Sequence, residues 1–271
     1  MKERASIVIS QIHVYPVKSL GGEARQTAYV EPRGLRHDRR WMVVDPEGRF
    51  LTQRTLPRMA LISARTDSDA LVLQAPSLRA LRVPLTPPAG SDLVDVRVWQ
   101  SECRALAVSP DADRWLSDVL QSPCRLVYMP DHTQRLVPAE FRRAEGIVSF
   151  ADAFPLLLVG EASLHDLNTR LAVPIPINRF RPNIVVSGTA PYAEDSWQAV
   201  TLGEALFYVV KPCARCLVTT IDQATGLSDS PEPLRTLASY RRQGEKVVFG
   251  QYLIPAALGT VSVGMRVQAH G

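Results

Sequence analysis

The sequence predicts a β-rich α+β fold made of two joined units. Short extended segments with β-branched or alternating apolar residues recur along the chain, and turns rich in Pro and Gly separate them. Few segments have helical spacing. Because parallel strands need helical crossovers, this pattern favours an antiparallel barrel or sandwich. Its character changes after Pro130-Asp131, so we expect one unit over residues 1–130 and a second over 131–271.

The first unit is expected to contain several strands and one helix. The expected strands are residues 7–16, 41–44, 50–54, 71–74, 94–98 and 125–129. Asp45-Pro46-Glu47-Gly48 separates the second from the third, with proline presetting φ and glycine taking the strained position, and it therefore predicts a hairpin. The helix is expected near residues 112–120.

The second unit is expected to contain two helices among its strands. A helix over residues 161–171 places Leu164, Leu167 and Leu171 on one face, and another helix is expected at about 232–241. The expected strands are residues 184–187, 206–210, 217–221, 249–254 and 261–267, the last interrupted by Gly264.

Composition and charge exclude several classes of function. With 46% hydrophobic and 21% charged residues, the 271-residue chain has an ordinary globular composition. Its net charge of +4 is mild and no long basic run occurs, so nucleic acid is not an expected partner. No apolar stretch is long enough for a signal peptide or a membrane span, and we expect a cytoplasmic protein. In that compartment the four cysteines do not suggest disulfides.

Cys213 and Cys216 form the one Cys-x-x-Cys pair, a spacing that serves half of a zinc site, a dithiol redox pair or a single metal ligand with a neighbour. A zinc site would need a second pair, but Cys103 and Cys124 are far apart and the histidines show no ligand spacing. A dithiol pair would be expected at the start of a helix, whereas residues 217–221 are β-prone.

Two interpretations of the pair remain open from the residues alone. Lys211 and Arg215 flank the cysteines and would favour a thiolate, which is the form that a soft metal prefers. The alternative is a pair of small buried cysteines without a chemical role.

The surroundings of the pair narrow this choice. The segment from Cys213 to Gly226 resembles the cofactor-cysteine segment of MOSC proteins, in the branch of the mitochondrial amidoxime-reducing components and their bacterial relatives. Further motifs of the same branch occur in family order: Tyr15-Pro-Val-Lys-Ser19, Gly34-Leu-Arg-His-Asp-Arg-Arg-Trp41, Glu161-Ala-Ser-Leu164, Asp166-Leu-Asn168, Phe180-Arg-Pro-Asn183, Tyr192-Ala-Glu-Asp-Ser-Trp197 and Phe249-Gly-Gln-Tyr252. Together they extend the resemblance from about residue 7 to residue 267.

The resemblance implies a fold and a site. The two units would be a MOSC N-terminal β-barrel domain and a MOSC domain, with a molybdenum cofactor (Mo-molybdopterin) between them. Cys216 would be the catalytic cysteine and metal ligand, and Cys213 a neighbour of unassigned role. The further cofactor-binding residues would be Lys18, Ser19, Arg39, Arg181 and Asn183. The phosphate of molybdopterin suits a guanidinium fork and a lysine point charge.

The resemblance also implies an activity, the reduction of N-hydroxylated compounds such as amidoximes, hydroxylamines or N-hydroxylated purines. Larger bacterial relatives add a ferredoxin domain with a Cys-x4-Cys-x2-Cys signature, which this sequence lacks. We therefore expect an external electron-donor protein, either a flavoprotein reductase or a ferredoxin-like protein. Two alternatives remain: a cofactor or sulfur carrier that uses a Cys216 persulfide, and a non-catalytic zinc-binding or interaction module.

Overall fold

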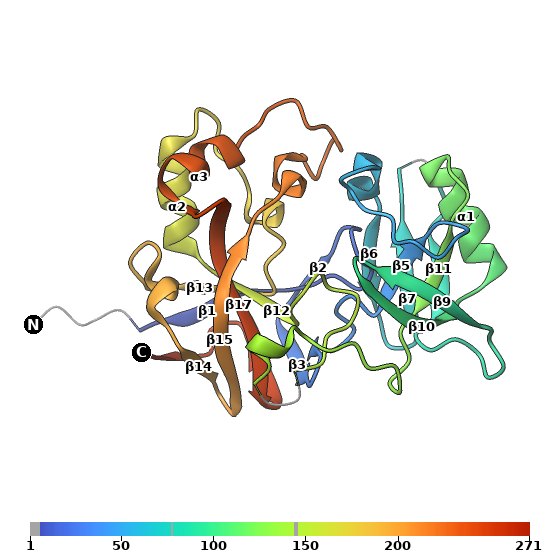
Figure 1. Cartoon of the computed structure of the whole chain (residues 1–271), viewed down its shortest axis with the longest axis horizontal. Helices are drawn as coiled ribbons and strands as arrows, with labels where there is room; N and C mark the ends of the chain where they lie inside the picture. Colours follow the sequence, from blue (N-terminus) through green and yellow to red (C-terminus); the bar gives the residue numbers. More distant parts are fainter. Residues whose placement is uncertain (1–5, 77, 144–145) are drawn as a thin grey trace, which may run out of the picture.

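The computed structural model describes residues 6–76, 78–143 and 146–271, and these form the expected β-rich α+β fold. Figure 1 shows two lobes side by side, with β5–β11 and α1 in one lobe and α2, α3 and most other strands in the other. We call the first the β5–β11 lobe and the second the sheet lobe. No helix in the described part of the chain has the length and apolar character needed to cross a membrane.

The sheet lobe contains a nine-stranded sheet in the order β19-β14-β15-β17-β12-β13-β1-β2, with β16 paired to β17. Its strands are β1 (Val8–Val14), β2 (Glu23–Arg25), β12 (Leu156–Gly160), β13 (Ile184–Ser187), β14 (Ala199–Leu202), β15 (Ala205–Ala214), β16 (Arg242–Gln243), β17 (Lys246–Ala257) and β19 (Val267–His270). A second sheet joins β18 (Gly259–Ser262), β3 (Thr27–Glu31) and β4 (Gly34–Leu35). Apolar residues from both sheets, such as Ile9, Val30 and Phe207, share one core.

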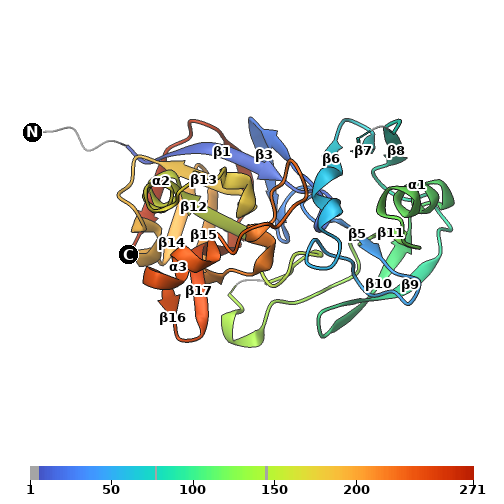
Figure 2. The ribbon, with the colours of Figure 1, turned by 90° about the horizontal axis from the view of Figure 1, so that it is seen from above.

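One strand pair of the sheet lobe, β12 and β13, is parallel. The helix α2 (Glu161–Arg170) lies between these strands in sequence and makes the crossover that a parallel pair needs. With α3 (Leu234–Tyr240) it covers one face of the sheet, where Leu167 and Leu237 pack near the stacked rings of Phe180 and Phe249 (Figure 2). This packing fixes the chain that leads into β13, which later supplies part of the site.

The β5–β11 lobe consists of two small antiparallel sheets and a helix. One sheet has the order β5-β11-β10-β9 and the other β6-β7-β8. The bounds are β5 (Trp41–Val44), β6 (Ser63–Thr66), β7 (Ala70–Gln74), β8 (Leu81–Pro84), β9 (Leu93–Val98), β10 (Ser101–Ala107), β11 (Arg125–Tyr128) and α1 (Pro110–Leu120). Helix α1 begins where Ser109 Oγ accepts a hydrogen bond from the Ala112 amide, and it buries Leu116 against Trp41 and Leu71.

The two lobes are not two consecutive stretches of sequence. Strands β1–β4, from residues 8–35, belong to the sheets of the sheet lobe, and the chain enters the other lobe only at β5. It returns between β11 and β12. The boundary at residue 130 therefore stays a prediction about sequence domains, and the segments that cross between the lobes become the natural place for a shared site.

Two predicted strands are wrong. Residues 50–54 make only an isolated bridge between Phe50 and Val44, because the Thr52 carbonyl accepts the amides of Thr55 and Leu56 and turns the chain. Residues 217–221 form a 3-10 turn, η5 (Leu217–Thr220), instead of a strand. The hydroxyls of its threonines bond backbone carbonyls, which satisfies a helical turn and overrides their β propensity.

The other predicted elements are present with shifted ends. The predicted strand at 206–210 is the longer β15, whose pairing with β17 has irregularities that accommodate Pro212 and bring Cys213 into the strand. The turn predicted at Asp45–Gly48 is confirmed, although the second strand of the hairpin is reduced to the bridge between Val44 and Phe50: Gly48 has φ +79° and its amide donates to the Asp45 carbonyl. Gly264, with φ +83°, separates β18 from β19 as expected.

Candidate cofactor site

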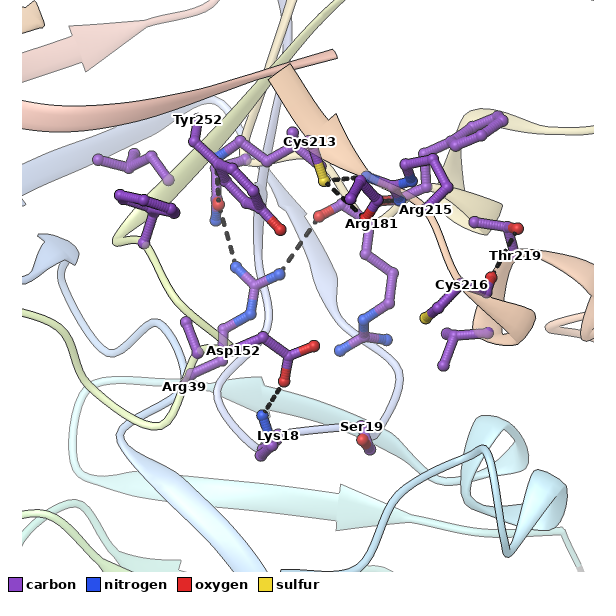
Figure 3. A pocket seen from close by; sticks show the side chains of 18 of the residues that line it. Lys18, Ser19, Arg39, Asp152, Arg181, Cys213, Arg215, Cys216, Thr219 and Tyr252 are labelled. Atoms are coloured by element: carbon purple, nitrogen blue, oxygen red, sulfur yellow. Dashed lines mark hydrogen bonds and ion pairs between the residues drawn. The ribbon is translucent and has the colours of Figure 1, made fainter. Parts of the chain in front are cut away.

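A pocket between the two lobes gathers every residue that the sequence analysis assigned to the cofactor. Lys18, Ser19, Arg39, Arg181, Asn183 and Cys216 all line it (Figure 3). The cavity itself has a volume of about 130 Å³, and the pocket continues into open solvent. These residues come from the β1–β5 connection, the start of β13 and the segment after β15.

The pocket is strongly basic. Six basic side chains line it, namely Lys18, Arg39, Arg54, Arg179, Arg181 and Arg215, and Asp152 is the one carboxylate among the described lining residues. Burial opposes the charge of Asp152, but Lys18 and Arg54 outweigh it and hold the pKa of this carboxyl well below its usual range. Burial lowers the pKa of Lys18, although its ion pair with Asp152 partly compensates. Such a surface is suited to an anionic ligand.

Arg39 is held by a buried network behind the pocket. Its Nη1 donates to Asn183 Oδ1 at 3.0 Å and to Asp38 Oδ2 at 2.5 Å, and its Nη2 donates to the Arg181 carbonyl at 3.2 Å. Asn183 also accepts the Leu157 amide and donates to the His13 carbonyl and Asp38. The Asn183 amide thus uses both acceptor and both donor positions internally, so this geometry fits positioning of Arg39 better than direct ligand contact.

The buried ring of Tyr15 lies against both Arg39 and Arg181. The guanidinium carbons lie 4.5 Å and 4.2 Å from the ring centroid, respectively. Arg181 Nη1 donates to the Leu20 carbonyl at 2.6 Å, while its Nη2 is buried without a partner among the described residues. Burial, followed by the charge of Arg39, lowers the pKa of Arg181 to about 10, so the side chain remains cationic at neutral pH. The π-face attraction offsets part of the repulsion between the guanidinium groups.

Cys216 stands at the start of η5, directly after β15 has ended. Its carbonyl accepts both the amide and the hydroxyl of Thr219 at 3.0 Å, which fixes its backbone. Its sulfur is partly exposed to the pocket and accepts a hydrogen bond from Arg54 Nη2 at 3.2 Å. A thiol at this place can reach a ligand in the pocket.

Cys213 differs from Cys216 in burial and in bonding. It is 3% exposed, and its sulfur accepts a 2.7 Å hydrogen bond from Arg215 Nη1. The same guanidinium donates to the Phe180 carbonyl at 2.6 Å and lies over the Phe180 ring. Both cysteines are free thiols, and Figure 3 shows their sulfur atoms in separate parts of the pocket wall.

Arg179 binds the backbone of the segment that follows Cys216. It is 7% exposed, and its Nε and Nη2 donate to the carbonyls of Thr219 and Thr220 at 2.9 Å and 2.7 Å. Its Nη1 pairs with Asp222 at 3.4 Å. The 3-10 turn that carries Cys216 is therefore tied to the segment that leads to Arg181.

Three of the seven non-glycine residues with positive φ in the described part of the chain line this pocket. Ser19, Arg39 and Arg181 have φ values of +65°, +49° and +55°, which residues other than glycine rarely adopt. Trp99, next to the pocket rim, has φ +56°. Residues held in such conformations are often found at functional sites because the surrounding fold must enforce them.

The donor set fits an anionic cofactor whose metal needs one protein sulfur. Arg181 Nη2 and Arg215 Nε are buried donors without partners within the described ranges. No cluster of three or more His, Cys, Asp or Glu side chains in the described residues could hold a metal ion. A metal here would thus need ligands of its own, with the Cys216 thiolate completing a soft-donor set.

The sequence analysis missed several residues of the pocket. Arg54 is the last residue of the wrongly predicted strand at 50–54, and Arg179 precedes the matched Phe180 motif, so neither had a signal of its own. The family resemblance does place the segment around Asp152 near the cofactor, but with mainly backbone contacts expected. Instead the Asp152 side chain takes part directly, with Oδ1 bonded to Lys18 and Oδ2 at 3.2 Å from Arg54. Tyr15 lay inside a quoted motif but had no assigned role.

Two family models match this chain. The MOSC N-terminal beta barrel domain matches residues 6–123, and the MOSC domain matches residues 145–268. Both agree with the resemblance drawn from the motifs.

Similar full-length proteins agree with these matches. The chain is 40% identical to mitochondrial amidoxime-reducing component 1 of Mus musculus over 94% of its own length and 80% of the relative's. It is 36% identical to the Homo sapiens component 1, over 94% and 81%. For component 2 of Rattus norvegicus the identity is 33% over 94% and 81%. The chain therefore belongs to the family of the mitochondrial amidoxime-reducing components, with a MOSC N-terminal β-barrel domain and a MOSC domain.

Proposed function

We propose that this protein is a molybdenum-cofactor-dependent reductase of N-hydroxylated compounds, an oxidoreductase that acts on amidoximes, hydroxylamines or N-hydroxylated purines. The observation that carries the proposal is the pocket in which a part-exposed Cys216 lies among six buried or partly buried basic side chains. Family membership and the named activity of the relatives, amidoxime reduction, support it.

The residues of this chain would divide the binding work. Arg181 and Lys18 would hold the phosphate of molybdopterin, with Ser19 beside them, since guanidinium and ammonium donors form charge-assisted hydrogen bonds with such anions. Arg39 would do so from the position that Asn183 fixes. Cys216 would provide the thiolate to the metal. When bound, the cofactor would supply the redox chemistry that these side chains lack.

The substrate would be a small molecule that enters from the solvent side of the pocket. Phe154, Leu156 and Leu157 add apolar surface to the pocket lining. This surface would limit the water around the reacting groups. An external electron-donor protein, either a flavoprotein reductase or a ferredoxin-like protein, would return the cofactor to its reduced state after each turnover. A cytoplasmic location remains our proposal for the chain.

Metal and pterin analysis of protein purified from a molybdenum-replete host tests the proposal. We expect stoichiometric molybdenum and pterin, together with reduction of benzamidoxime by the chemically reduced protein. Stoichiometric zinc without pterin would reject it and favour the zinc-binding module. A Cys216 persulfide without amidoxime reduction would favour the sulfur-carrier alternative.

A further inference from the structure

Arg54 is the one described residue that bonds the sulfur of Cys216 with its side chain, and it comes from the opposite lobe. Arg54 Nη2 lies 3.2 Å from Cys216 Sγ and 3.2 Å from Asp152 Oδ2. Its guanidinium carbon lies 4.7 Å from the centroid of the Trp99 ring. A thiol, a carboxylate and an indole thus restrict this guanidinium on three sides.

The loop that carries Arg54 is itself fixed by buried bonds. Thr52 Oγ1 accepts the Arg54 amide at 3.1 Å, and the Thr52 carbonyl closes the turn. Gln53, fully buried, donates to the Ser19 carbonyl at 2.8 Å. Its amide also exchanges hydrogen bonds with that of Gln223, at 3.0 Å and 3.2 Å, which ties this loop to the segment after η5. These bonds therefore fix the loop of Arg54 relative to the segment that follows Cys216, across the boundary between the lobes.

Trp99 adds a second sign that Arg54 is held for a purpose other than folding. This tryptophan is 46% exposed and has a left-handed backbone, which is costly for a bulky side chain. Its indole Nε1 donates to Asp152 Oδ1 at 3.2 Å, and its ring covers Arg54. An exposed and strained tryptophan contributes little to a core, but here it orients the pair that faces Cys216.

We propose that Arg54 is a positioning residue for Cys216, and that its charge-assisted hydrogen bond to Sγ fixes the sulfur and raises the reduction potential of a metal bound there. The inference rests on the proposed function. Hydrogen bonds to a ligating sulfur withdraw charge from it, which favours the reduced state of the metal. Arg54 would thereby set how readily this centre accepts electrons from its donor.

The test is a redox titration of the holoprotein, followed by electron paramagnetic resonance of the half-reduced metal. Arg54→Gln removes the charge, and Arg54→Lys keeps the charge but lacks the fork that reaches sulfur and carboxylate together. Arg58→Gln, at an exposed arginine of the next turn, is the matched control for loss of one positive charge. Trp99→Leu leaves Arg54 in place but removes the ring above it.

We expect a lower potential and an altered resonance spectrum in Arg54→Gln, a smaller change in Arg54→Lys and in Trp99→Leu, and none in Arg58→Gln. The value of kcat should fall roughly ten- to a hundredfold in Arg54→Gln, with little change in KM. An unchanged potential in every Arg54 and Trp99 variant that carries the metal overturns the inference, even where one variant fails to load. Wild-type protein without molybdenum would instead overturn the proposed function.

Discussion

Arg179 and Arg181 stand on either side of Phe180, yet the protein uses them in opposite ways. The guanidinium of Arg179 donates to two backbone carbonyls and pairs with Asp222. That of Arg181 makes one hydrogen bond, to Leu20, within the described part of the chain, and leaves a buried Nη2 without a partner. Arg179 is thus committed to the fold, while Arg181 retains donors for a ligand.

The two cysteines of the pocket also differ in how the fold uses them. Cys213 is buried and its sulfur accepts from Arg215, whose guanidinium also bonds the backbone. Cys216 is part-exposed in the pocket. In both pairs, position in the sequence barely distinguishes the members. The arginines differ in how many of their donors the fold already uses, whereas each cysteine sulfur accepts one bond from an arginine and the two differ in burial.

The largest expected effect concerns this second pair. Cys216→Ala should abolish benzamidoxime reduction by the chemically reduced protein, because the metal would lose its thiolate, while the fold and much of the pterin remain. Cys213→Ala should keep substantial activity, since it shortens one small side chain. Activity assays, with circular dichroism and pterin analysis as controls, measure both. Complete loss in both folded variants would reject the contrast and favour dithiol chemistry.

The two arginines should separate cofactor binding from stability. Arg181→Gln removes charge-assisted hydrogen bonds worth roughly 1.5–3 kcal/mol and should lower cofactor occupancy. Arg179→Gln leaves buried carbonyls without donors, so it should lower the free energy of unfolding by about 2 kcal/mol. Urea denaturation of cofactor-free protein and pterin analysis give the two readouts. The contrast fails if Arg181→Gln keeps full occupancy, or if both variants lose the same stability.

Asp152 is the carboxylate that pairs with Lys18 and Arg54 in the pocket, and its contribution to the stability of the fold should depend on pH. Because its folded-state pKa lies below the unfolded value of about 3.9, the carboxylate stabilises the folded protein above that pH. This contribution is lost as the pH falls through the folded-state pKa. At neutral pH it should be worth only about 1 kcal/mol, since the side chain is 44% exposed and solvent screens the pair.

Urea denaturation of wild type and Asp152→Asn measures this dependence. The difference in unfolding free energy should stay constant from about pH 7 to pH 5 and shrink below about pH 4. A difference that grows on acidification would mean that Asp152 is protonated in the folded protein at neutral pH.

Much of the fold could be predicted from local patterns. Trp41–Val44 and Ile184–Ser187 are strands over the predicted residues, and α1 begins within two residues of its prediction because Ser109 and Pro110 mark its start. The β-prone run 217–221 misled because threonine hydroxyls and the distant Arg179 satisfy a helical turn there. No local pattern reports a donor that arrives from 40 residues away.

The candidate site was predictable only as far as motifs extend. The resemblance named six residues that do share one pocket, and whether each binds the cofactor stays a prediction. It did not identify Arg54, because the contact with Cys216 depends on how the two lobes face each other. It also did not indicate that Asn183 has no bonding capacity left, which depends on partners such as His13 and Asp38.

A modest effect is also expected at the ring between the two guanidinium groups. Tyr15 is buried, and its hydroxyl has no hydrogen-bond partner in the ranges that the structure describes. Tyr15→Phe keeps both π faces and removes an unsatisfied hydroxyl, so cofactor occupancy should be unchanged and the folded protein equally or slightly more stable. Tyr15→Leu removes the π faces, worth about 0.5–1 kcal/mol for each guanidinium, and should modestly lower occupancy. Pterin analysis over a range of salt concentrations distinguishes the two variants. In Tyr15→Leu the ring no longer offsets the repulsion between Arg39 and Arg181, and this repulsion depends on salt. If Tyr15→Leu matches Tyr15→Phe at every salt concentration, the ring serves only as packing and the guanidinium groups are held apart by their hydrogen bonds alone.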